Sequence, residues 1–379
     1  MIFSGNVTFW TLKRPGVNVY YIIAAGPALF AMKKSARTML LRAIAAAALL
    51  AAWPAPRALA GGAGTTTANF LKIPVAAVPS GLAEAYTAMV GPDSMLYNPA
   101  GLGLLSYSSL SGSHNQYIDG ITQEYLAATW RSPWGTLGAA FTTLNSGSID
   151  AYDANDMRIG DTSSGHTMMS LSFGQSWPHF NQDIGKLDPM LITPGWTKVP
   201  LVRDYRPRSY RFSAGATVKK ISEKLGSDSA SSYAYDAGVL LVLPHHFHLG
   251  ASALNMGGSE KFAGETYKLP SAARFGFAKD FRTINDVMVF TLSSDLVKYS
   301  DSGYISATGL ETDVMRLFQL RIGYQTRKDS GSRISGGFGM TFDSLADKNS
   351  FLRGARVDYS YLDYGSLGGT HRLGVQFIW

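Results

Sequence analysis

Hydrophobic and polar residues alternate with a period of two along most of the chain after residue 106. In 317–324, one side carries Phe318, Leu320, Ile322 and Tyr324, and the other carries Gln319, Arg321 and Gly323. The same period runs through 210–218, 333–342 and 371–379. It is typical of β-strands, whose successive side chains point to opposite faces. A soluble β-sandwich also alternates, so the period by itself leaves the architecture open.

Three further features favour a membrane-spanning barrel. The alternating segments are about 8 to 11 residues long, which is the length that a tilted strand needs to cross a bilayer. Their polar faces carry mostly Gly, Ser and Thr, and aromatic residues such as Trp130, Trp177 and Trp379 gather near segment ends, as in interfacial girdles. We therefore predict an all-β, transmembrane, up-and-down antiparallel barrel of about fourteen strands over 106–379. The predicted strands are 106–114, 123–130, 135–144, 167–177, 210–219, 233–243, 247–254, 272–279, 286–296, 304–311, 317–324, 333–342, 354–361 and 371–379.

The predicted connections mostly alternate between short and long. Longer loops are expected at 145–166, 220–232, 255–271 and 297–303, on the outer side of the membrane, with short turns on the periplasmic side. Two segments depart from this parity, because 178–209 and 343–353 are longer than turns and fall on the periplasmic side.

An export signal precedes the barrel. Residues 32–60 contain a basic start, an apolar run and an Ala-Leu-Ala site before Gly61, which together predict a cleaved signal peptide. Since such a peptide belongs at the N-terminus, we expect translation to start at Met32 and residues 1–31 to be an upstream extension. The mature part, 61–379, has no apolar run near 18 residues, so a membrane role would use strands.

The segment 61–105, between the signal and the first strand, is predicted to plug the barrel. Ser80 is a candidate N-cap for a helix over 81–90, which Gly91-Pro92-Asp93 would end. A segment of this length with its own helix at the mouth of a barrel could fill the lumen.

Composition and charge narrow the function. The net charge of +7 arises in residues 1–60, which hold seven basic and no acidic residues, leaving 27 of each sign in the remainder. This balance argues against a nucleic-acid partner. With no cysteine, disulfides and thiolate metal sites are excluded. We expect no cofactor.

Several stretches resemble the PorV/PorQ (UPF0164) family, which is itself related to the FadL-type long-chain fatty-acid transporters. They lie in the predicted plug, in the middle of the barrel and near its end: 67–73, 81–88, 93–102, 254–258, 269–270, 274–276, 320–324, 357–361 and 368–373. The chain departs from the family at 75–80, where a Gly/Ala run is usual, and at Leu96, where an aromatic residue is usual.

This resemblance implies a FadL-type barrel with an N-terminal hatch in the outer membrane of a Gram-negative-type bacterium. It leaves two functions open. One is the inward passage of hydrophobic small molecules, and the other is a type IX secretion accessory that binds secreted client proteins. Outer-membrane lipid and the barrel-assembly machinery are the other expected partners.

The stretch Asn98-Pro99-Ala100-Gly101 is the first candidate site. Proline holds Asn98 extended and Gly101 permits a sharp turn, so the four residues could form a hatch that senses or gates a ligand. An ordinary turn leading into the first strand explains them equally well.

The C-terminal strand is the second candidate. Leu373, Val375, Phe377 and Trp379 share one face and end on an aromatic residue, which favours a signal for the barrel-assembly machinery over a last strand without that role.

Arg211, Arg321 and Asp358 lie on predicted lumen faces. They could form a polar path or anchor a carboxylate, although interior ion pairs that fill the barrel are the simpler interpretation.

Other patterns do not indicate chemistry. The run His245-His246-Phe247-His248 follows a proline in a predicted turn without an adjacent carboxylate, so we expect no metal site. The glycines of 336–339 lie within a strand, and no Gly-x-Ser-x-Gly motif occurs. We predict no catalytic residues and no enzymatic activity.

Overall fold

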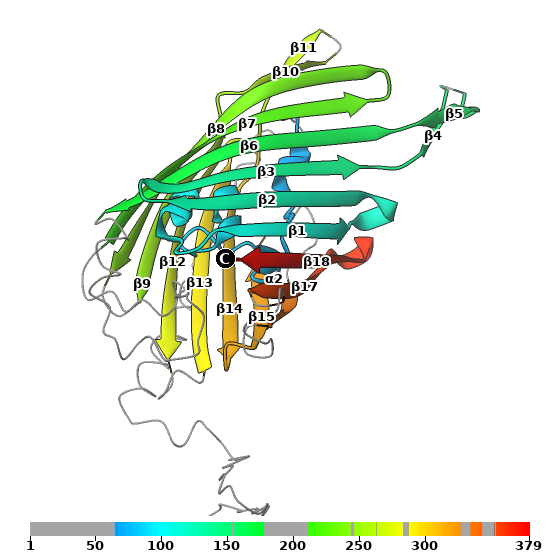
Figure 1. Cartoon of the computed structure of the whole chain (residues 1–379). Helices are drawn as coiled ribbons and strands as arrows, with labels where there is room; N and C mark the ends of the chain where they lie inside the picture. Colours follow the sequence, from blue (N-terminus) through cyan, green and yellow to red (C-terminus); the bar gives the residue numbers. More distant parts are fainter. Residues whose placement is uncertain are drawn as a thin grey trace, which may run out of the picture. The chain divides into compact units, whose positions relative to one another are not determined.

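A computed structural model describes residues 65–153, 155–177, 211–243, 246–262, 264–282, 288–326, 334–342, 352 and 354–379. Over these residues the chain forms a closed barrel of fourteen antiparallel strands (Figure 1), which confirms the predicted fold class. Barrel strands that follow one another in the chain are neighbours, and β1 closes on β18, with Ser109 opposite Ile378. The predicted signal peptide, the proposed start at Met32 and the segment 178–209 lie outside the described residues.

The barrel strands are β1 (Ser109–Gln116), β2 (Thr122–Ser132), β3 (Gly135–Asn145), β6 (Ser164–Trp177), β7 (Arg211–Leu225), β8 (Asp228–Leu243), β9 (Phe247–Met256), β12 (Ala272–Arg282), β13 (Met288–Tyr299), β14 (Tyr304–Val314), β15 (Phe318–Gln325), β16 (Ile334–Thr341), β17 (Ala355–Asp363) and β18 (Gly369–Ile378). Two small hairpins, β4 (Ile149–Tyr152) with β5 (Arg158–Thr162) and β10 (Ser259–Phe262) with β11 (Glu265–Lys268), extend from one end. We call this the hairpin end, and the opposite end, where β18 finishes at Trp379, the closing end. Short 3₁₀ turns, η4 (Ile118–Gly120) and η8 (Gly365–Leu367), connect strands at the hairpin end.

The predicted loop at 220–232 is wrong. Strands β7 and β8 stay paired to their tips, where Leu225 lies opposite Asp228 around a tight turn in which Gly226 has φ of 60°. Outward positions near these tips are polar or charged, as at Lys220 and Lys224. The apolar alternation therefore fades while the strands continue.

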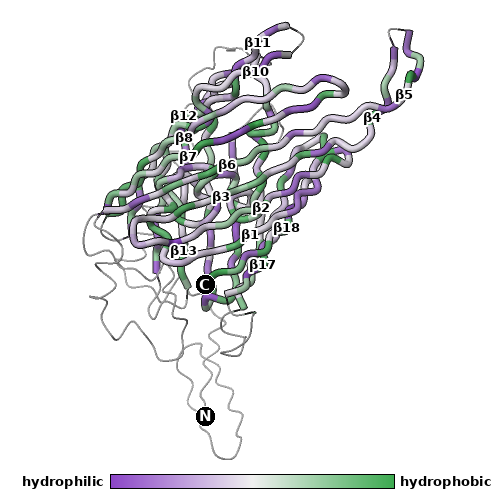
Figure 2. Tube along the Cα trace, turned by 45° about the horizontal axis from the view of Figure 1, so that its top comes forward, coloured by the Kyte–Doolittle hydropathy of each residue, from purple (hydrophilic) through white to green (hydrophobic). Residues whose placement is uncertain are grey.

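The outer face of the barrel wall is apolar and the inner face is polar, which is the reverse of a soluble barrel. On β15, Leu320 and Ile322 point outward and are 52% and 58% exposed, whereas Gln319 and Arg321 are buried inside. Hydrophobic and hydrophilic residues alternate along the strands in Figure 2, and hydrophilic stretches gather toward the hairpin end. A closed ring of strands with an apolar outer belt satisfies its backbone hydrogen bonds within itself, so the wall is suited to lipid.

Within the part of the chain that the structure describes, no helix is both long enough and apolar enough to span a membrane.

The segment Thr66–Leu105 is a plug that crosses the inside of the barrel (Figure 1). It contains η1 (Asn69–Lys72), α2 (Ala77–Gly81), η2 (Pro92–Leu96) and η3 (Pro99–Leu104). At the hairpin end, Thr66 bridges to Lys268 and the Lys72 ammonium lies 2.5 Å from an Asp301 carboxylate oxygen. At the closing end the plug leads into β1, where Ser108 exchanges backbone hydrogen bonds with Trp379.

The predicted helix over 81–90 is also wrong, since the helix is Ala77–Gly81 and Ser80 lies inside it. The hydroxyl of Ser80 donates to the Ala76 carbonyl, and Ala83 and Glu84 take φ of 52° and 64°. These left-handed residues break the helical hydrogen bonds, and barrel side chains bind the freed backbone groups instead.

Candidate functional site

The stretch Asn98–Gly101 connects the plug to the barrel wall through hydrogen bonds. Asn98 is fully buried and caps η3, with its side-chain oxygen accepting from the Ala100 amide at 3.2 Å. Its side-chain nitrogen donates to the carbonyls of Thr87 at 2.8 Å and Val239, on β8, at 3.0 Å. This asparagine therefore joins two parts of the plug and one strand. A role in sensing a ligand stays a prediction.

Inward glycines make room for the plug. A Cβ on Gly215 of β7 would lie 2.4 Å from the Pro99 carbonyl, and one on Gly250 of β9 would lie 2.4 Å from the Thr87 carbonyl. A Cβ on Gly323 of β15 would lie 2.5 Å from plug backbone. Because real Cβ contacts are not this short, the plug backbone sits directly on the wall at these points. We call β6–β15 the seating wall.

A buried ion pair on the seating wall, Arg274 with Asp295, forms hydrogen bonds to the loop after α2. The same Asp295 carboxylate oxygen accepts from the Tyr86 and Thr87 amides at 3.1 and 3.0 Å and from the Thr87 hydroxyl at 2.6 Å. Arg274 donates to that oxygen at 2.9 Å and to the Glu84 carbonyl at 2.6 Å. The strands β12 and β13 thus replace the hydrogen bonds that a helix would have made.

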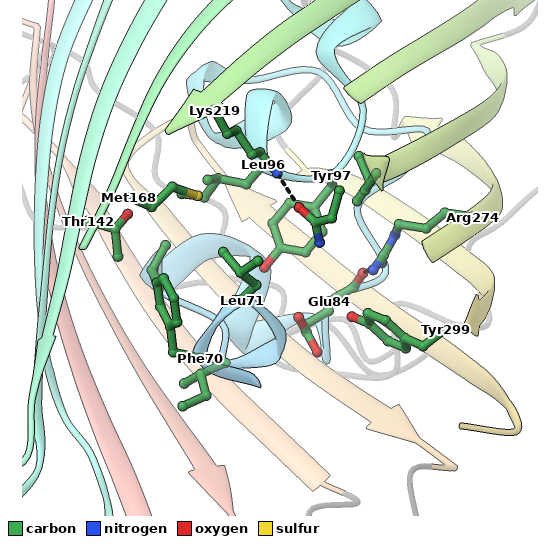
Figure 3. Close-up of a pocket in the computed structure, with 14 residues that line it drawn as sticks. Phe70, Leu71, Glu84, Leu96, Tyr97, Thr142, Met168, Lys219, Arg274 and Tyr299 are labelled. Carbon is green, nitrogen blue, oxygen red and sulfur yellow. Dashed lines mark hydrogen bonds between the residues drawn. The ribbon is translucent and has the colours of Figure 1, made fainter. Parts of the chain in front are cut away.

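A pocket lies between the plug and the seating wall (Figure 3). Its apolar lining comes from both sides, with Phe70, Leu71, Ile73 and Leu96 on the plug and Met168 and Leu254 on the wall. Its two cations are already paired: Lys219 lies 2.7 Å from Asp236, and Arg274 lies 2.9 Å from Asp295. About 50 Å³ is free for water-sized molecules, which is room for only a few waters.

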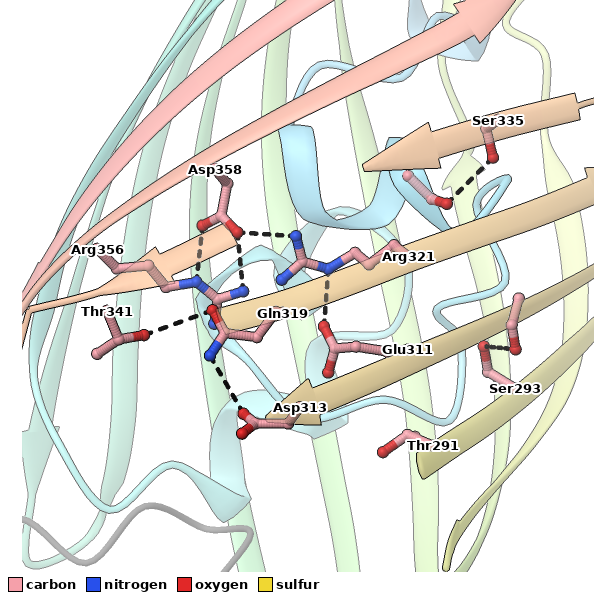
Figure 4. Close-up of polar contacts among 12 residues, drawn as sticks. Thr291, Ser293, Glu311, Asp313, Gln319, Arg321, Ser335, Thr341, Arg356 and Asp358 are labelled. Carbon is pink, nitrogen blue, oxygen red and sulfur yellow. Dashed lines mark hydrogen bonds and ion pairs between the residues drawn. The ribbon is translucent and has the colours of Figure 1, made fainter. Parts of the chain in front are cut away.

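Two of the predicted lumen residues belong to a charge network on β14–β17 (Figure 4). The Arg321 guanidinium lies 2.7 Å from Glu311 and 2.8 Å from Asp358, and Asp358 also pairs with Arg356 at 2.7 Å. Arg211, at the start of β7, is 1% exposed and lies apart from this network along the ring of strands. The arrangement favours interior ion pairs at Arg321 and Asp358 over an open carboxylate anchor.

The C-terminal residues Leu373, Val375, Phe377 and Trp379 all point outward and are exposed. They lie on the strand that closes the barrel against β1. Their role as an assembly signal stays a prediction.

Sequence reasoning missed the residues that hold the plug, Arg274 and Asp295 among them. Their only signal was a charge at an inward position of an alternating strand, which does not identify a partner. Of the histidine run, His245 lies outside the described residues, and His246 occupies a turn with φ of 58°. Among the residues described, no cluster of three or more His, Cys, Asp or Glu could hold a metal ion.

Comparisons with known proteins give likeness in fold only. No family model matches the chain, and no curated protein sequence matches it. The solved structures that it resembles include the TodX monoaromatic hydrocarbon channel as a deltaS2S3 mutant (TM-score 0.44, 12% identity, 76% of this chain and 93% of that one). A Pseudomonas aeruginosa FadL homologue has a TM-score of 0.41 and 10% sequence identity, and the match covers 81% of this chain and 96% of that one. The outer membrane protein Omp33 of Acinetobacter baumannii has a TM-score of 0.39 and 11% sequence identity, and the match covers 73% of this chain and 100% of that one.

Proposed function

We propose that this protein is an outer-membrane barrel that passes hydrophobic small molecules inward when its plug moves. The observation that carries the proposal is the pocket between plug and seating wall, to which both contribute apolar side chains beside polar ones such as Glu84 and Asn255. A ligand that enters it must contact the plug and the wall together. Because the pocket has only about 50 Å³ free while the plug is seated, a larger ligand binds better when the plug has moved, and its binding therefore favours the displaced plug.

The paired charges around the pocket favour a neutral or weakly polar ligand. A carboxylate would have to compete with Asp236 for Lys219 and with Asp295 for Arg274, and breaking a buried pair is costly. Apolar surface contributes roughly 25 cal/mol per Å² buried, so an apolar molecule gains from the same pocket without that competition.

The described plug blocks the lumen, so passage requires it to shift. The free space of about 50 Å³ is far smaller than the volume of about 300 Å³ or more that is typical of small-molecule sites. We infer that the closing end faces the periplasm, where the plug would be released. The type IX accessory function has no observation in its favour and is not proposed.

A disulfide between plug and wall tests this proposal directly, because the chain has no cysteine of its own. A Cβ on Gly374 of β18 would lie 3.4 Å from the Ala77 Cβ, close to the spacing of about 3.8 Å in disulfides. In cells expressing the Ala77→Cys/Gly374→Cys protein, oxidation should slow entry of the fluorescent hydrophobe N-phenyl-1-naphthylamine, and dithiothreitol should restore it.

Each single cysteine variant is the matched control and should be insensitive to oxidation. Entry that stays fast while the disulfide is shown to be formed would overturn the proposal, because the plug would then not control passage.

A further inference from the structure

The wall opposite the pocket carries a row of four buried polar residues. Gln123, Asn115, Arg372 and Ser360 face one another directly across β2, β1, β18 and β17. All four point inward and are at most 1% exposed. We call these four strands the polar wall.

Each residue of the row keeps one polar atom without a hydrogen-bond partner among the described residues: Gln123 Nε2, Asn115 Oδ1, Arg372 Nη2 and Ser360 Oγ. In Gln123, Asn115 and Arg372 the other polar groups are engaged, whereas the hydroxyl of Ser360 is its one polar side-chain group. Asn115 donates to Gln123 at 2.9 Å, and Arg372 donates to the Pro74 carbonyl and the Thr370 hydroxyl, both at 2.8 Å. Three of the four free atoms therefore belong to side chains that are otherwise held in place.

The same feature continues toward the closing end. Tyr125 and Ser113 form the next pair of inward residues across β2 and β1, and Ser111 is the next inward residue of β1. The hydroxyls of all three lack a hydrogen-bond partner within the described ranges. These three side chains line a cavity of about 20 Å³ between the polar wall and the plug. That volume holds one or two waters.

The plug is less tightly seated on this side. A Cβ on the inward Gly374 would meet the Ala77 Cβ at 3.4 Å, an ordinary contact, whereas the equivalent distance at Gly215 of the seating wall is 2.4 Å. At the closing end, Gln376 is half-buried rather than buried, so the strip opens there. At the hairpin end, the rings of Tyr117 and Tyr364, which come directly after β1 and β17, meet edge to face with centroids 5.4 Å apart.

Buried polar atoms without partners are rare in folded proteins, because each costs the free energy of a lost hydrogen bond. Seven on four adjacent strands form a continuous strip that can bind water along its length. We propose that the polar wall carries a file of water, which makes a narrow hydrophilic passage past the seated plug. It is separate from the route for hydrophobic molecules and does not depend on it.

The charge on the strip determines which solutes can accompany the water. Arg372 is fully buried and none of the described carboxylates is in ion-pair contact with it, so its positive charge repels cations from the row of four residues. Of the two carboxyls that line the cavity, Asp93 and Asp358, the second is already paired with Arg321 and Arg356. A fixed arginine beside a narrow pore excludes protons and cations in this way. The passage therefore admits water and excludes sodium and potassium.

Osmotic shrinkage of proteoliposomes, measured by stopped-flow light scattering, tests the proposal with the purified full chain. The wild type should shrink several-fold faster than empty liposomes at neutral pH, with no added conductance to potassium. The Ser111→Leu/Ser113→Leu variant, whose side chains fill the cavity, should fall to the rate of empty liposomes. Thr312→Leu is the matched control, because Thr312 lies opposite the outward-facing Leu320, and it should shrink as the wild type does.

A wild-type rate equal to that of empty liposomes overturns the proposal, and so does an unchanged rate in the double variant. Heat-modifiable migration on gels establishes that each variant is folded. Entry of N-phenyl-1-naphthylamine should be unchanged in the double variant, so failure of the water passage is distinguishable from failure of the hydrophobic route.

A second measurement does not depend on the leucine variants folding. If the Ser360 hydroxyl is truly without a partner, Ser360→Ala should raise the temperature of heat modification. If water bonds to it, as proposed, that temperature should stay the same or fall, and a clear rise would count against the water file.

Discussion

The plug meets the two walls of the barrel differently. On the seating wall, glycines bring strand backbone against plug backbone, and Asp295 and Arg274 bind plug amides and carbonyls directly. Asn98 of the plug donates in turn to the Val239 carbonyl of β8. On the polar wall, Arg372 donates to the Pro74 carbonyl of the plug, but a Cβ on Gly374 would meet the plug at an ordinary van der Waals distance, and several hydroxyl and amide groups have no partner among the described residues. The contrast teaches that one barrel can hold a plug firmly on one side and keep a hydrated seam on the other.

Removal of Asp295 should have the largest effect on the seating wall. Asp295→Ala leaves Arg274 buried without its carboxylate and two plug amides without an acceptor, which should cost about 3–5 kcal/mol of stability. Denaturant unfolding of the purified barrel measures this loss. Asp161→Ala on the exposed β4–β5 hairpin breaks a half-exposed ion pair and should change stability by less than about 1 kcal/mol.

Glycine-to-alanine substitutions compare the two walls directly. Gly215→Ala forces a methyl group against the Pro99 carbonyl and should destabilise the barrel by about 1–3 kcal/mol, as overpacking does. Gly374→Ala adds the same methyl group on the polar wall, where the nearest plug atom is 3.4 Å away, and should be close to neutral. Equal losses at both positions, measured by thermal unfolding, would show that the plug is seated equally on both sides.

The Asp93 carboxyl, on the part of the plug that faces the polar wall, predicts that the stability of the barrel depends on pH. Burial, with help from the neighbouring Asp358 carboxylate, raises the pKa of Asp93 from 3.8 to about 7, against the opposing effect of Arg356 and Arg321. Because the folded pKa is the higher one, the stabilisation is complete below about pH 4 and is lost as the pH rises to 7. Asp93→Asn should remove this part of the slope between about pH 4 and 7, and identical pH profiles of thermal unfolding would contradict the assignment.

Two serines give the smallest expected difference. The Ser213 hydroxyl donates to the Ala100 carbonyl of the plug at 2.6 Å, so Ser213→Ala should cost about 1 kcal/mol. Ser232→Ala provides a comparison near the hairpin end, where the hydroxyl lies at a longer 3.2 Å from Glu260 and should contribute less. Chemical denaturation of both variants would sharpen the ranking, and a larger loss at Ser232 would contradict it.

The fold was predicted from the sequence and is confirmed, whereas the family resemblance and the site roles are still predictions. Strand alternation predicted all fourteen barrel strands, most of them close to their observed positions, as with Leu317–Tyr324 against the observed Phe318–Gln325. The exceptions are β7 and β8, which extend into the predicted loop at 220–232. Membership of the PorV/PorQ family stays a prediction, as do the hatch role of Asn98–Gly101 and the assembly role of Trp379.

The sequence by itself determined the barrel, because a period of two is a local property and the outer belt must be apolar at every strand. It could not determine the plug, where Glu84 has a left-handed backbone and its carbonyl is bound by Arg274, which is 190 residues away. It also could not pair Asn115 with Arg372, since the register between β1 and β18 exists only when the barrel closes. Local periodicity specifies which face a residue takes, and only closure of the ring decides which residues share the lumen.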